Sequence, residues 1–242
     1  MTSRTVRGRL AARTTALALV GALTLTGCGL FDGGSEPVPA ETDASPLERV
    51  YDSQFTRDGT FQSHIEVDGA KDVDFVYTLY PTKSTPRTNE WYPRGKKFFS
   101  FTFQAYDLAQ GLRDPFRTKR KVYLERIQVT SRTITSGGGR TERPYELDAE
   151  ARRITFDPEP LSTRYGMLIT SPKGAFELRN QAIRGTDPDT RGIDLMFTAT
   201  VWIETAAGSG RFIERTVEQT VPIAIFESDE KTEVADIPVN AN

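Results

Sequence analysis

The sequence of 242 residues contains a single cysteine, Cys28, and a single histidine, His64. One cysteine excludes an intramolecular disulfide framework, so packing and hydrogen bonds have to stabilise the fold. Zinc and copper sites commonly use several Cys or His side chains, and a nucleophile relay needs a base beside a Ser or Cys. We therefore expect no metal, no cofactor and no catalytic residue, and we expect His64 to face solvent on a surface strand.

The chain also lacks a large net charge. Its 31 Lys and Arg against 33 Asp and Glu give a formal charge of −2, and Arg4, Arg7, Arg9 and Arg13 lie at the N-terminus with no acid among them. Loss of that segment removes these four positive charges and leaves −6. Binding to nucleic acid or to anionic lipid needs clustered Lys and Arg. We expect no nucleic-acid partner and no broad electrostatic attachment to lipid.

Apolar runs are short as well. The main run covers residues 16–25, whereas a helix that spans a bilayer needs about 20 apolar residues. It follows the four arginines and lies within an uncharged segment, residues 14–27. A basic end followed by a short apolar centre is the layout of a cleaved secretory signal. Because no adjacent arginine pair precedes the run, export of the unfolded chain is favoured over the twin-arginine route.

The end of this segment reads Leu25-Thr26-Gly27-Cys28. These residues resemble the lipobox of bacterial lipoproteins, in which a branched apolar residue and two small residues precede a cysteine. The resemblance, which covers only residues 1–28, implies cleavage before Cys28, lipidation of its sulfur and attachment of the exported protein to the extracytoplasmic side of the cell membrane. Two or more acyl chains give stable attachment. The alternative is an ordinary secretory signal with an incidental cysteine.

Composition divides the chain after the signal, residues 1–27. Residues 29–45 are rich in Gly, Pro, Ser and acids without periodicity, so residues 28–45 are predicted to be a lipidated cysteine and a flexible tether. Ser45-Pro46-Leu47-Glu48 matches a capping box with Pro at the first helical position, which predicts a short helix at about 46–56. Residues 46–230 are predicted to fold as one large β domain, with two small domains as the alternative, and residues 231–242 to form a tail.

Apolar residues alternate with polar ones along much of the domain, which is the period of a half-buried strand. The strongest alternation covers residues 193–203, and it resumes at 213–225 after a turn-forming stretch, so these segments are predicted to form a long antiparallel hairpin. Pro222 has no N–H to donate, which places the second strand at a sheet edge or a bulge. Further strands are expected at 73–79 and 99–105, and weaker ones at 62–67, 121–135, 151–156, 165–170 and 175–180, with a flexible turn at 137–139.

Many strands separated by turns, with little helical periodicity, predict a mainly β fold. We expect an antiparallel β-sandwich with one short N-terminal helix. An immunoglobulin-like sandwich is the first choice. A jelly roll stays open as the alternative, because no internal cysteines provide the disulfide signature of an immunoglobulin domain.

One candidate binding site is a polar stretch between two strong strands. Aromatic loops at the ends of sandwiches often bind ligands or proteins. Aromatic side chains near a loop also commonly plug the end of a core, which is the alternative interpretation. The candidate residues are Asn89, Glu90, Trp91, Tyr92 and Arg94.

A second candidate is a basic cluster just before a predicted strand. Such a cluster is suited to contact lipid headgroups, an anionic glycan or an acidic partner. Edge strands also carry Lys to prevent pairing with other chains, and this interpretation is favoured. The residues are Arg117, Lys119, Arg120 and Lys121.

In the segment from Asp187 to Asp194, acids at alternate positions precede a Gly, which resembles the start of a calcium loop. Arg191 stands where an oxygen ligand belongs, and Thr198 stands where a bidentate glutamate belongs. We therefore expect a turn that leads into the following strand, and no metal site.

These observations favour a membrane-anchored, non-enzymatic envelope lipoprotein whose β-sandwich binds a protein or an envelope polymer. One alternative is a hydrolase that cleaves a cell-wall glycan with two carboxylates, although 33 acids supply chance pairs and no spacing selects one. Another alternative is a structural subunit that joins a surface assembly through its edge strand.

Overall fold

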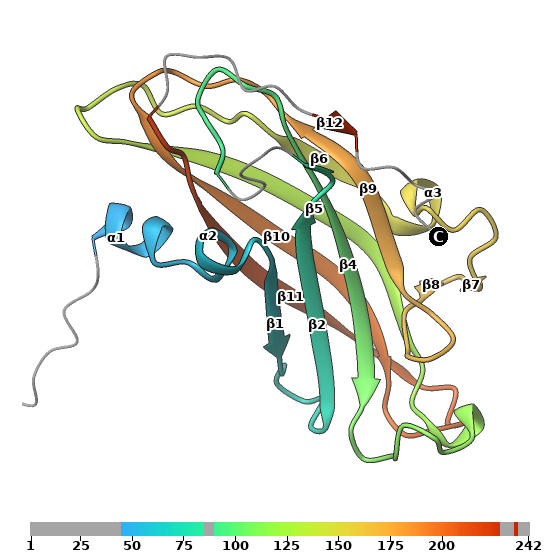
Figure 1. Ribbon diagram of the computed structural model, residues 1–242. Helices are drawn as coiled ribbons and strands as arrows, with labels where there is room; N and C mark the ends of the chain where they lie inside the picture. The colour runs from blue at the N-terminus through green and yellow to red at the C-terminus, as the bar shows by residue number, and fades with distance from the viewer. Residues whose placement is uncertain (1–44, 85–89, 228–234, 237–242) are drawn as a thin grey trace, which may run out of the picture. The chain divides into compact units, whose positions relative to one another are not determined.

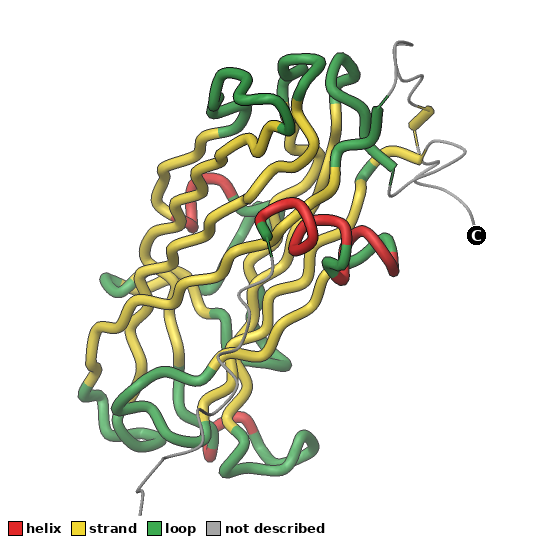
Figure 2. Tube along the Cα trace, turned by 90° about the vertical axis from the view of Figure 1, so that its left-hand side faces the viewer, coloured by secondary structure: helices red, strands yellow, loops and turns green. Residues whose placement is uncertain are grey.

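The computed structural model describes residues 45–84, 90–227 and 235–236. The predicted signal, lipobox and most of the predicted tether lie outside the described residues, as does Asn89. Strands make up about half of the described chain (Figures 1 and 2). Among the described helices, none is both long enough and apolar enough to cross a membrane.

The first sheet is antiparallel and has the strand order β1-β2-β4-β9. Its central strand β4 carries phenylalanines at alternate positions, as the sequence predicts. The bounds are Phe61–Ile65 for β1, Val73–Pro81 for β2, Lys97–Asp107 for β4 and Phe176–Ile183 for β9.

The second sheet has the order β11-β10-β5-β8-β7, and β6 also pairs with β5. The predicted long hairpin is confirmed, because β10 and β11 pair from Gly192 opposite Ala224 to Glu204 opposite Phe212. Pro222 lies on β11 at the edge of this sheet, as predicted. The bounds are β5 Val122–Thr135, β6 Glu146–Glu150, β7 Ser162–Thr163, β8 Gly166–Leu168, β10 Thr190–Glu204 and β11 Phe212–Ala224, with a separate pair of β3 Lys83–Ser84 and β12 Ala235–Asp236.

The chain therefore folds as a mainly β antiparallel sandwich, which confirms the predicted class. Consecutive strands β4 and β5 lie in different sheets, and they pair with the consecutive strands β9 and β10. In an immunoglobulin-like sandwich the consecutive strands B and C lie in different sheets, B pairs with E and C pairs with F. Strand G then pairs with F, as β11 pairs with β10. Of the two alternatives, this pairing favours the immunoglobulin-like one, with β1 as an additional strand.

The core lies between the two sheets and is rich in aromatic rings. Phe101 and Phe103 of the first sheet and Phe197 of the second are at most 1% exposed. The ring centroids of Phe101 and Phe197 are 4.9 Å apart, and those of Tyr77 and Phe103 are 4.2 Å apart. Burial of each such side chain contributes about 2–3 kcal/mol, so the fold needs neither disulfide nor metal.

The predicted N-terminal helix is two helices, α1 Pro46–Tyr51 and α2 Gln54–Asp58. The predicted capping box is present, with mutual hydrogen bonds between Ser45 and Glu48. The helix stops early because the Ser53 side chain accepts a hydrogen bond from the Thr56 amide and so begins α2.

Helix α1 packs on the outer face of β10. Its Val50 lies against Gly192, where an added Cβ would come within 2.9 Å of a Val50 methyl carbon. Arg49 donates two hydrogen bonds of 2.7 and 2.9 Å to Asp194, whose side chain is almost fully buried. A charge-assisted bidentate pair of this kind fixes orientation as well as position.

One predicted strand is wrong. Residues 151–156 contain the short helix α3, Ala151–Ile154, instead of a strand. Ala151 is buried and Ile154 packs against the core, and a separation of three residues brings two side chains to one side of a helical turn. A remaining 3-10 turn, η1, covers Phe116–Thr118.

Candidate functional site

A concave surface lined by three arginines lies between the β5–β6 connection and the end of β9. We call it the arginine depression. It has a volume of about 560 Å³, which is large enough for a polar group of a polymer to enter. Its lining residues are Arg140, Thr141, Glu142, Arg143, Pro144, Arg184 and Gly185.

Arg184 joins the two segments that form this depression. Its guanidinium donates to the carbonyl oxygen of Arg143 at 2.8 Å and to that of Pro144 at 3.3 Å. Its backbone N–H also donates to Pro144, at 3.2 Å. Arg184 therefore contributes positive charge and at the same time holds the β5–β6 connection in place.

The other two guanidinium groups are available to a ligand. Arg140 and Arg143 are exposed, and neither has an ion pair or a side-chain hydrogen bond to another residue of the described chain. The acidic residue of the lining, Glu142, already accepts a hydrogen bond of 2.9 Å from the Asp187 amide. Guanidinium groups bind carboxylate and phosphate oxygens in pairs, so the depression is suited to an anion.

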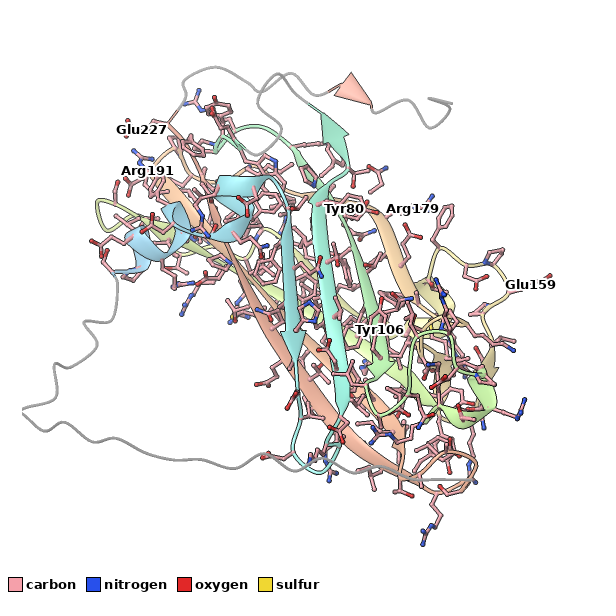
Figure 3. All side chains as sticks on the ribbon, turned by 60° about the horizontal axis from the view of Figure 1, so that its bottom comes forward. Tyr80, Tyr106, Glu159, Arg179, Arg191 and Glu227 are labelled. Atoms are coloured by element: carbon pink, nitrogen blue, oxygen red, sulfur yellow. The ribbon has the colours of Figure 1, made fainter. Side chains whose placement is uncertain are left out.

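Several arginines elsewhere on the surface are neutralised by acids. Arg191 forms an ion pair with Glu227 (Figure 3), and Arg179 forms one with Glu177 at 2.6 Å. These two guanidinium groups would have to leave a carboxylate in order to bind another anion. Arg140 and Arg143 have no such partner to leave in the described chain.

The predicted aromatic loop borders the arginine depression. An added Cβ on Gly185 would come within 3.2 Å of the Arg94 carbonyl oxygen, and the Thr186 amide donates to Pro93 at 2.8 Å. Arg94 is exposed. The loop thus brings a further arginine to the rim of the depression.

The aromatic residues of that loop do not form an exposed binding surface. Trp91 is only 5% exposed and packs against Phe55, with a distance of 5.0 Å between the ring centroids. Its backbone forms a bridge to Ile225. Tyr92 is half-buried and donates to Glu90 at 3.3 Å. For Trp91 the structure corrects the binding interpretation in favour of the alternative, a ring that closes the end of the core.

A buried lysine holds this loop. Lys97 is 3% exposed, and its ammonium group donates to the carbonyl oxygens of Pro93 at 3.1 Å and Gly95 at 2.8 Å. Burial disfavours the charged ammonium and lowers the pKa of Lys97 to about 8. The same Pro93 oxygen accepts from the Thr186 amide, so one carbonyl connects the loop, the lysine and the segment that carries Gly185.

Three of the four side chains of the predicted basic cluster interact with other residues of the protein. Lys119 is buried and donates to the carbonyl oxygen of Gly111 at 2.5 Å. Arg120 lies 2.6 Å from Asp107, and burial alone would raise the pKa of this carboxyl, but the hydrogen bonds from Arg120 outweigh burial and lower it. Lys121 is 3.9 Å from the buried Glu204. Of the four residues only Arg117 is left exposed without a partner in the described chain.

The predicted turn at Asp187 is confirmed, since the Thr190 amide donates to the Asp187 carbonyl at 2.9 Å where β10 begins. Asp189 accepts hydrogen bonds from Ser136, Gly137 and Gly139, and these bonds lower its pKa. The carboxylate therefore stabilises the predicted glycine turn. No metal-binding group of three or more His, Cys, Asp or Glu occurs among the described residues.

His64 lies on β1 and is largely exposed, as predicted. Its Nδ1 is 2.6 Å from an Asp74 carboxylate oxygen, and its Nε2 is 3.2 Å from the amide nitrogen of Gln62. Both ring nitrogens are thus engaged by neighbouring side chains. This arrangement stabilises the pairing of β1 with β2 and presents no free base.

No protein-family model and no curated protein matches this sequence. The function therefore has to be argued from the arrangement of residues.

The residues of the arginine depression carry no motif that would have identified them in the sequence. Arg140 and Arg143 are separated from Arg184 by about forty residues. The β5–β10 and β4–β9 pairings, together with the hydrogen bonds from Arg184, bring these segments together. The one available signal was the glycine turn at 137–139, which predicts a loop directly before the first two arginines.

Proposed function

We propose that this protein is a membrane-anchored cell-envelope lipoprotein whose β-sandwich binds an anionic polymer without catalysing a reaction. In this proposal the chain is exported, and lipid on Cys28 holds it at the extracytoplasmic side of the membrane. The arginine depression binds phosphate or carboxylate groups of the polymer.

The sequence supports the anchored location. The basic segment, the short apolar run and Leu25-Thr26-Gly27-Cys28 occur in the order of a lipoprotein signal. The predicted tether at residues 29–45 would separate the domain from the membrane by on the order of 20 Å, since a flexible chain extends with the square root of its length. A domain on such a tether can reach polymers near the membrane surface.

The observation that carries the binding proposal is the charge of the arginine depression. Three guanidinium groups line one concave surface, and its acidic lining residue Glu142 is engaged by a backbone amide. The overall composition is slightly acidic. The attraction of a polyanion is therefore confined to this local excess of positive charge, and the rest of the surface attracts it little.

Binding of polyphosphate and of polygalacturonate to the full chain, purified from membranes in detergent, tests this proposal. Biolayer interferometry measures the affinity of the wild type and of the double variant Arg140→Gln/Arg143→Gln. We expect at least about 30-fold weaker binding, because two charge-assisted contacts of about 1 kcal/mol each are lost. Arg184 is left unchanged because it also holds the backbone of Arg143 and Pro144.

The double variant Arg126→Gln/Arg152→Gln is the matched control. It removes the same charge from a different surface, where both guanidiniums are paired with carboxylates. Equal losses of polyphosphate binding in the two double variants would show that net charge alone attracts this polymer. That result, or the absence of saturable binding by the wild type at low salt, would contradict the proposal.

The anchor is tested separately. Mass spectrometry of the N-terminal peptide from native membranes should show an acylated Cys28, and Cys28→Ser should move the protein from the membrane to the soluble fraction. An unmodified thiol, or cleavage at another bond, would refute the lipoprotein assignment. Neither result bears on the arginine depression.

The glycan hydrolase remains a second candidate because Glu125 and Glu150 line one depression. Against it, Glu125 accepts a hydrogen bond of 2.6 Å from Trp202, and Glu150 is paired with Arg152 and Arg153. Release of reducing ends from a soluble glycan by the wild type, abolished in Glu125→Gln and Glu150→Gln, would favour the hydrolase and overturn the non-catalytic proposal.

A further inference from the structure

Four aromatic side chains meet on the outer face of the second sheet. Tyr165 is central, with ring centroids 4.4 Å from Phe212 and 5.1 Å from Trp202. Tyr123 lies 5.6 Å from Phe212 and 6.3 Å from Tyr165. We call these four residues the aromatic platform. They come from β5, the β7–β8 turn, β10 and β11.

The platform faces away from the core because of strand alternation. Trp202 stands between Val201 and Ile203, which are at most 1% exposed and belong to the core. Neighbouring residues of a strand point to opposite faces, so Trp202 points outward. It is half-buried by the other rings of the platform and not by the second layer of the sandwich.

The platform is built by a tight turn. Gly166 follows Tyr165 directly and has a φ of 109°, and an added Cβ would collide with the Leu124 carbonyl oxygen. Glycine alone allows so close an approach of the β7–β8 turn to the backbone of β5. This contact places Tyr165 over the neighbouring strands. The rings are therefore held rigidly before any ligand arrives.

A second depression adjoins the platform. Its volume is about 160 Å³, and we call it the paired-charge depression. The indole N–H of Trp202 donates to Glu125 at 2.6 Å, which links the platform to this depression. The lining residues are Glu125, Arg126, Glu150, Arg152, Arg164 and Gly166.

The charges of this depression are balanced within the protein. Arg126 forms an ion pair with Asp148 at 2.6 Å, and Arg152 forms one with Glu150 at 3.1 Å. Arg164 donates to the hydroxyl of Tyr165 and lies 4.7 Å from the centre of its ring. A polyanion gains little here, because each guanidinium has a partner that it would have to leave.

We propose that the aromatic platform and the paired-charge depression together bind a neutral carbohydrate chain. A sugar ring has an apolar C–H face that packs on an aromatic ring and hydroxyl groups that both donate and accept hydrogen bonds. The platform supplies the aromatic surface, and the carboxylate and guanidinium groups beside it supply fixed acceptors and donors. Rings that are already immobilised lose little entropy on binding.

The two tryptophans of the chain allow a direct test. Trp202 belongs to the platform and Trp91 is buried in the core, so a ligand on the platform changes the emission of Trp202 alone. The full chain is titrated with neutral oligosaccharides of N-acetylglucosamine, mannose, galactose and arabinose. We expect a saturable change with at least one of them, and no change with polyphosphate.

Variants of the platform separate a stacking role from a structural one. Tyr165→Ala and Trp202→Leu should weaken binding of the same oligosaccharide, measured by calorimetry, by about tenfold or more each. Tyr106→Ala is the matched control, because Tyr106 is a half-buried tyrosine on β4 of the other sheet. It should bind as the wild type does. Polyphosphate binding, which depends on the other depression, should be unchanged in all three variants.

Several results would overturn the proposal. One is the absence of saturable binding by any oligosaccharide of the panel, and another is binding that Tyr165→Ala and Trp202→Leu leave intact. A third is a dimer in sedimentation that either variant dissociates, which would identify a second copy of the chain as the occupant. The polymer-binding proposal for the arginine depression does not depend on any of these outcomes.

Discussion

Two depressions of the described chain, the arginine depression and the paired-charge depression, are each lined by three arginines, yet they differ in charge. They lie at opposite ends of β6, whose five residues extend on the order of 15 Å. Around the arginine depression, Arg140 and Arg143 have no carboxylate partner in the described chain. Around the paired-charge depression, Arg126 and Arg152 do.

Under the two binding proposals, the partners of the arginines, more than their number, decide what each surface binds. Two of the three arginines of the paired-charge depression have carboxylate partners, since Arg126 pairs with Asp148 and Arg152 with Glu150. The third, Arg164, donates to the hydroxyl of Tyr165. The first two arginines of the arginine depression follow a glycine turn, and the acid of the lining, Glu142, accepts a hydrogen bond from the Asp187 amide. The paired-charge depression is therefore suited to an uncharged polar ligand, and the arginine depression is suited to an anion.

The largest expected effect is on the free energy of unfolding, and it should remove the aromatic platform but leave the arginine depression intact. Gly166→Ala forces a Cβ into the backbone of Leu124 at a positive φ. We expect a loss of about 3 kcal/mol or more in the free energy of unfolding, measured by urea denaturation, together with loss of oligosaccharide binding. Polyphosphate binding by the folded fraction should persist.

Gly208→Ala is the control for that substitution. Gly208 also has a positive φ, of 73°, but an added Cβ would meet no atom within 4 Å. We expect a cost of only about 1 kcal/mol from the backbone conformation. Equal destabilisation by the two substitutions would mean that the close approach of the β7–β8 turn to β5 does not hold the platform.

The second effect concerns the lysine beside the arginine depression. Burial lowers the pKa of Lys97 from 10.5 to about 8 in the folded protein, so between these values the unfolded chain binds a proton that the folded chain does not. Stability contributed by this group therefore rises with pH in that window. From about pH 7.5 to 9.5 the gain is about 2 kcal/mol. Urea denaturation of the wild type and of Lys97→Met measures it as the difference between their pH dependences.

A constant difference in stability between wild type and Lys97→Met over this range would be inconsistent with a buried ammonium. It would also remove the reason for regarding the loop that carries Arg94 as fixed by Lys97. The arginine depression would then be a loosely held anion site, in contrast to the rigid aromatic platform.

Salt gives the third and smaller effect. If three guanidinium groups bind a polyanion, the affinity for polyphosphate should fall by about 10- to 20-fold between about 50 and 200 mM salt, because bound counterions are released. Binding of a neutral oligosaccharide should change little over the same range. Interferometry at several salt concentrations measures how steeply each affinity depends on salt. Equal salt dependences for the two ligands would contradict the distinction between the two depressions.

The smallest effect is expected from the exposed ion pair between Arg126 and Asp148. Each side chain is 45% exposed, and ion pairs in solvent contribute little to stability because water and salt screen them. Asp148→Asn should therefore change the free energy of unfolding only slightly. It should, however, strengthen polyphosphate binding at the paired-charge depression by freeing Arg126, which interferometry in the Arg140→Gln/Arg143→Gln background would detect. Unchanged binding there would show that pairing does not exclude anions.

Much of the fold could be predicted from local patterns. Alternation predicted the β10–β11 hairpin, and the missing N–H of Pro222 predicted its edge position. The pattern at 151–156 misled, because a single buried turn with Ala151 and Ile154 has too few residues to reveal its period. The break between α1 and α2 also depends on one side-chain hydrogen bond from Ser53.

The sites were harder to predict than the strands. The basic cluster at Arg120 is prominent in the sequence, but its partners Asp107 and Glu204 come from other strands and neutralise it. Trp91 is in a polar loop by sequence and in the core by structure. For the aromatic platform a signal was present, since Trp202 occupies an outward position of a strongly alternating strand, but Tyr123 and Tyr165 are distant from it in the sequence.

The sequence by itself determined the sandwich class, the main hairpin and the capping box, because these depend on side-chain alternation and on contacts between residues close along the chain. It also provides the lipoprotein prediction, which depends on a short contiguous segment. Only the tertiary structure decided which charges remain unpaired and which rings face outward together. An ion pair or an aromatic cluster depends on distances between strands, and those distances exist only after the sheets have formed.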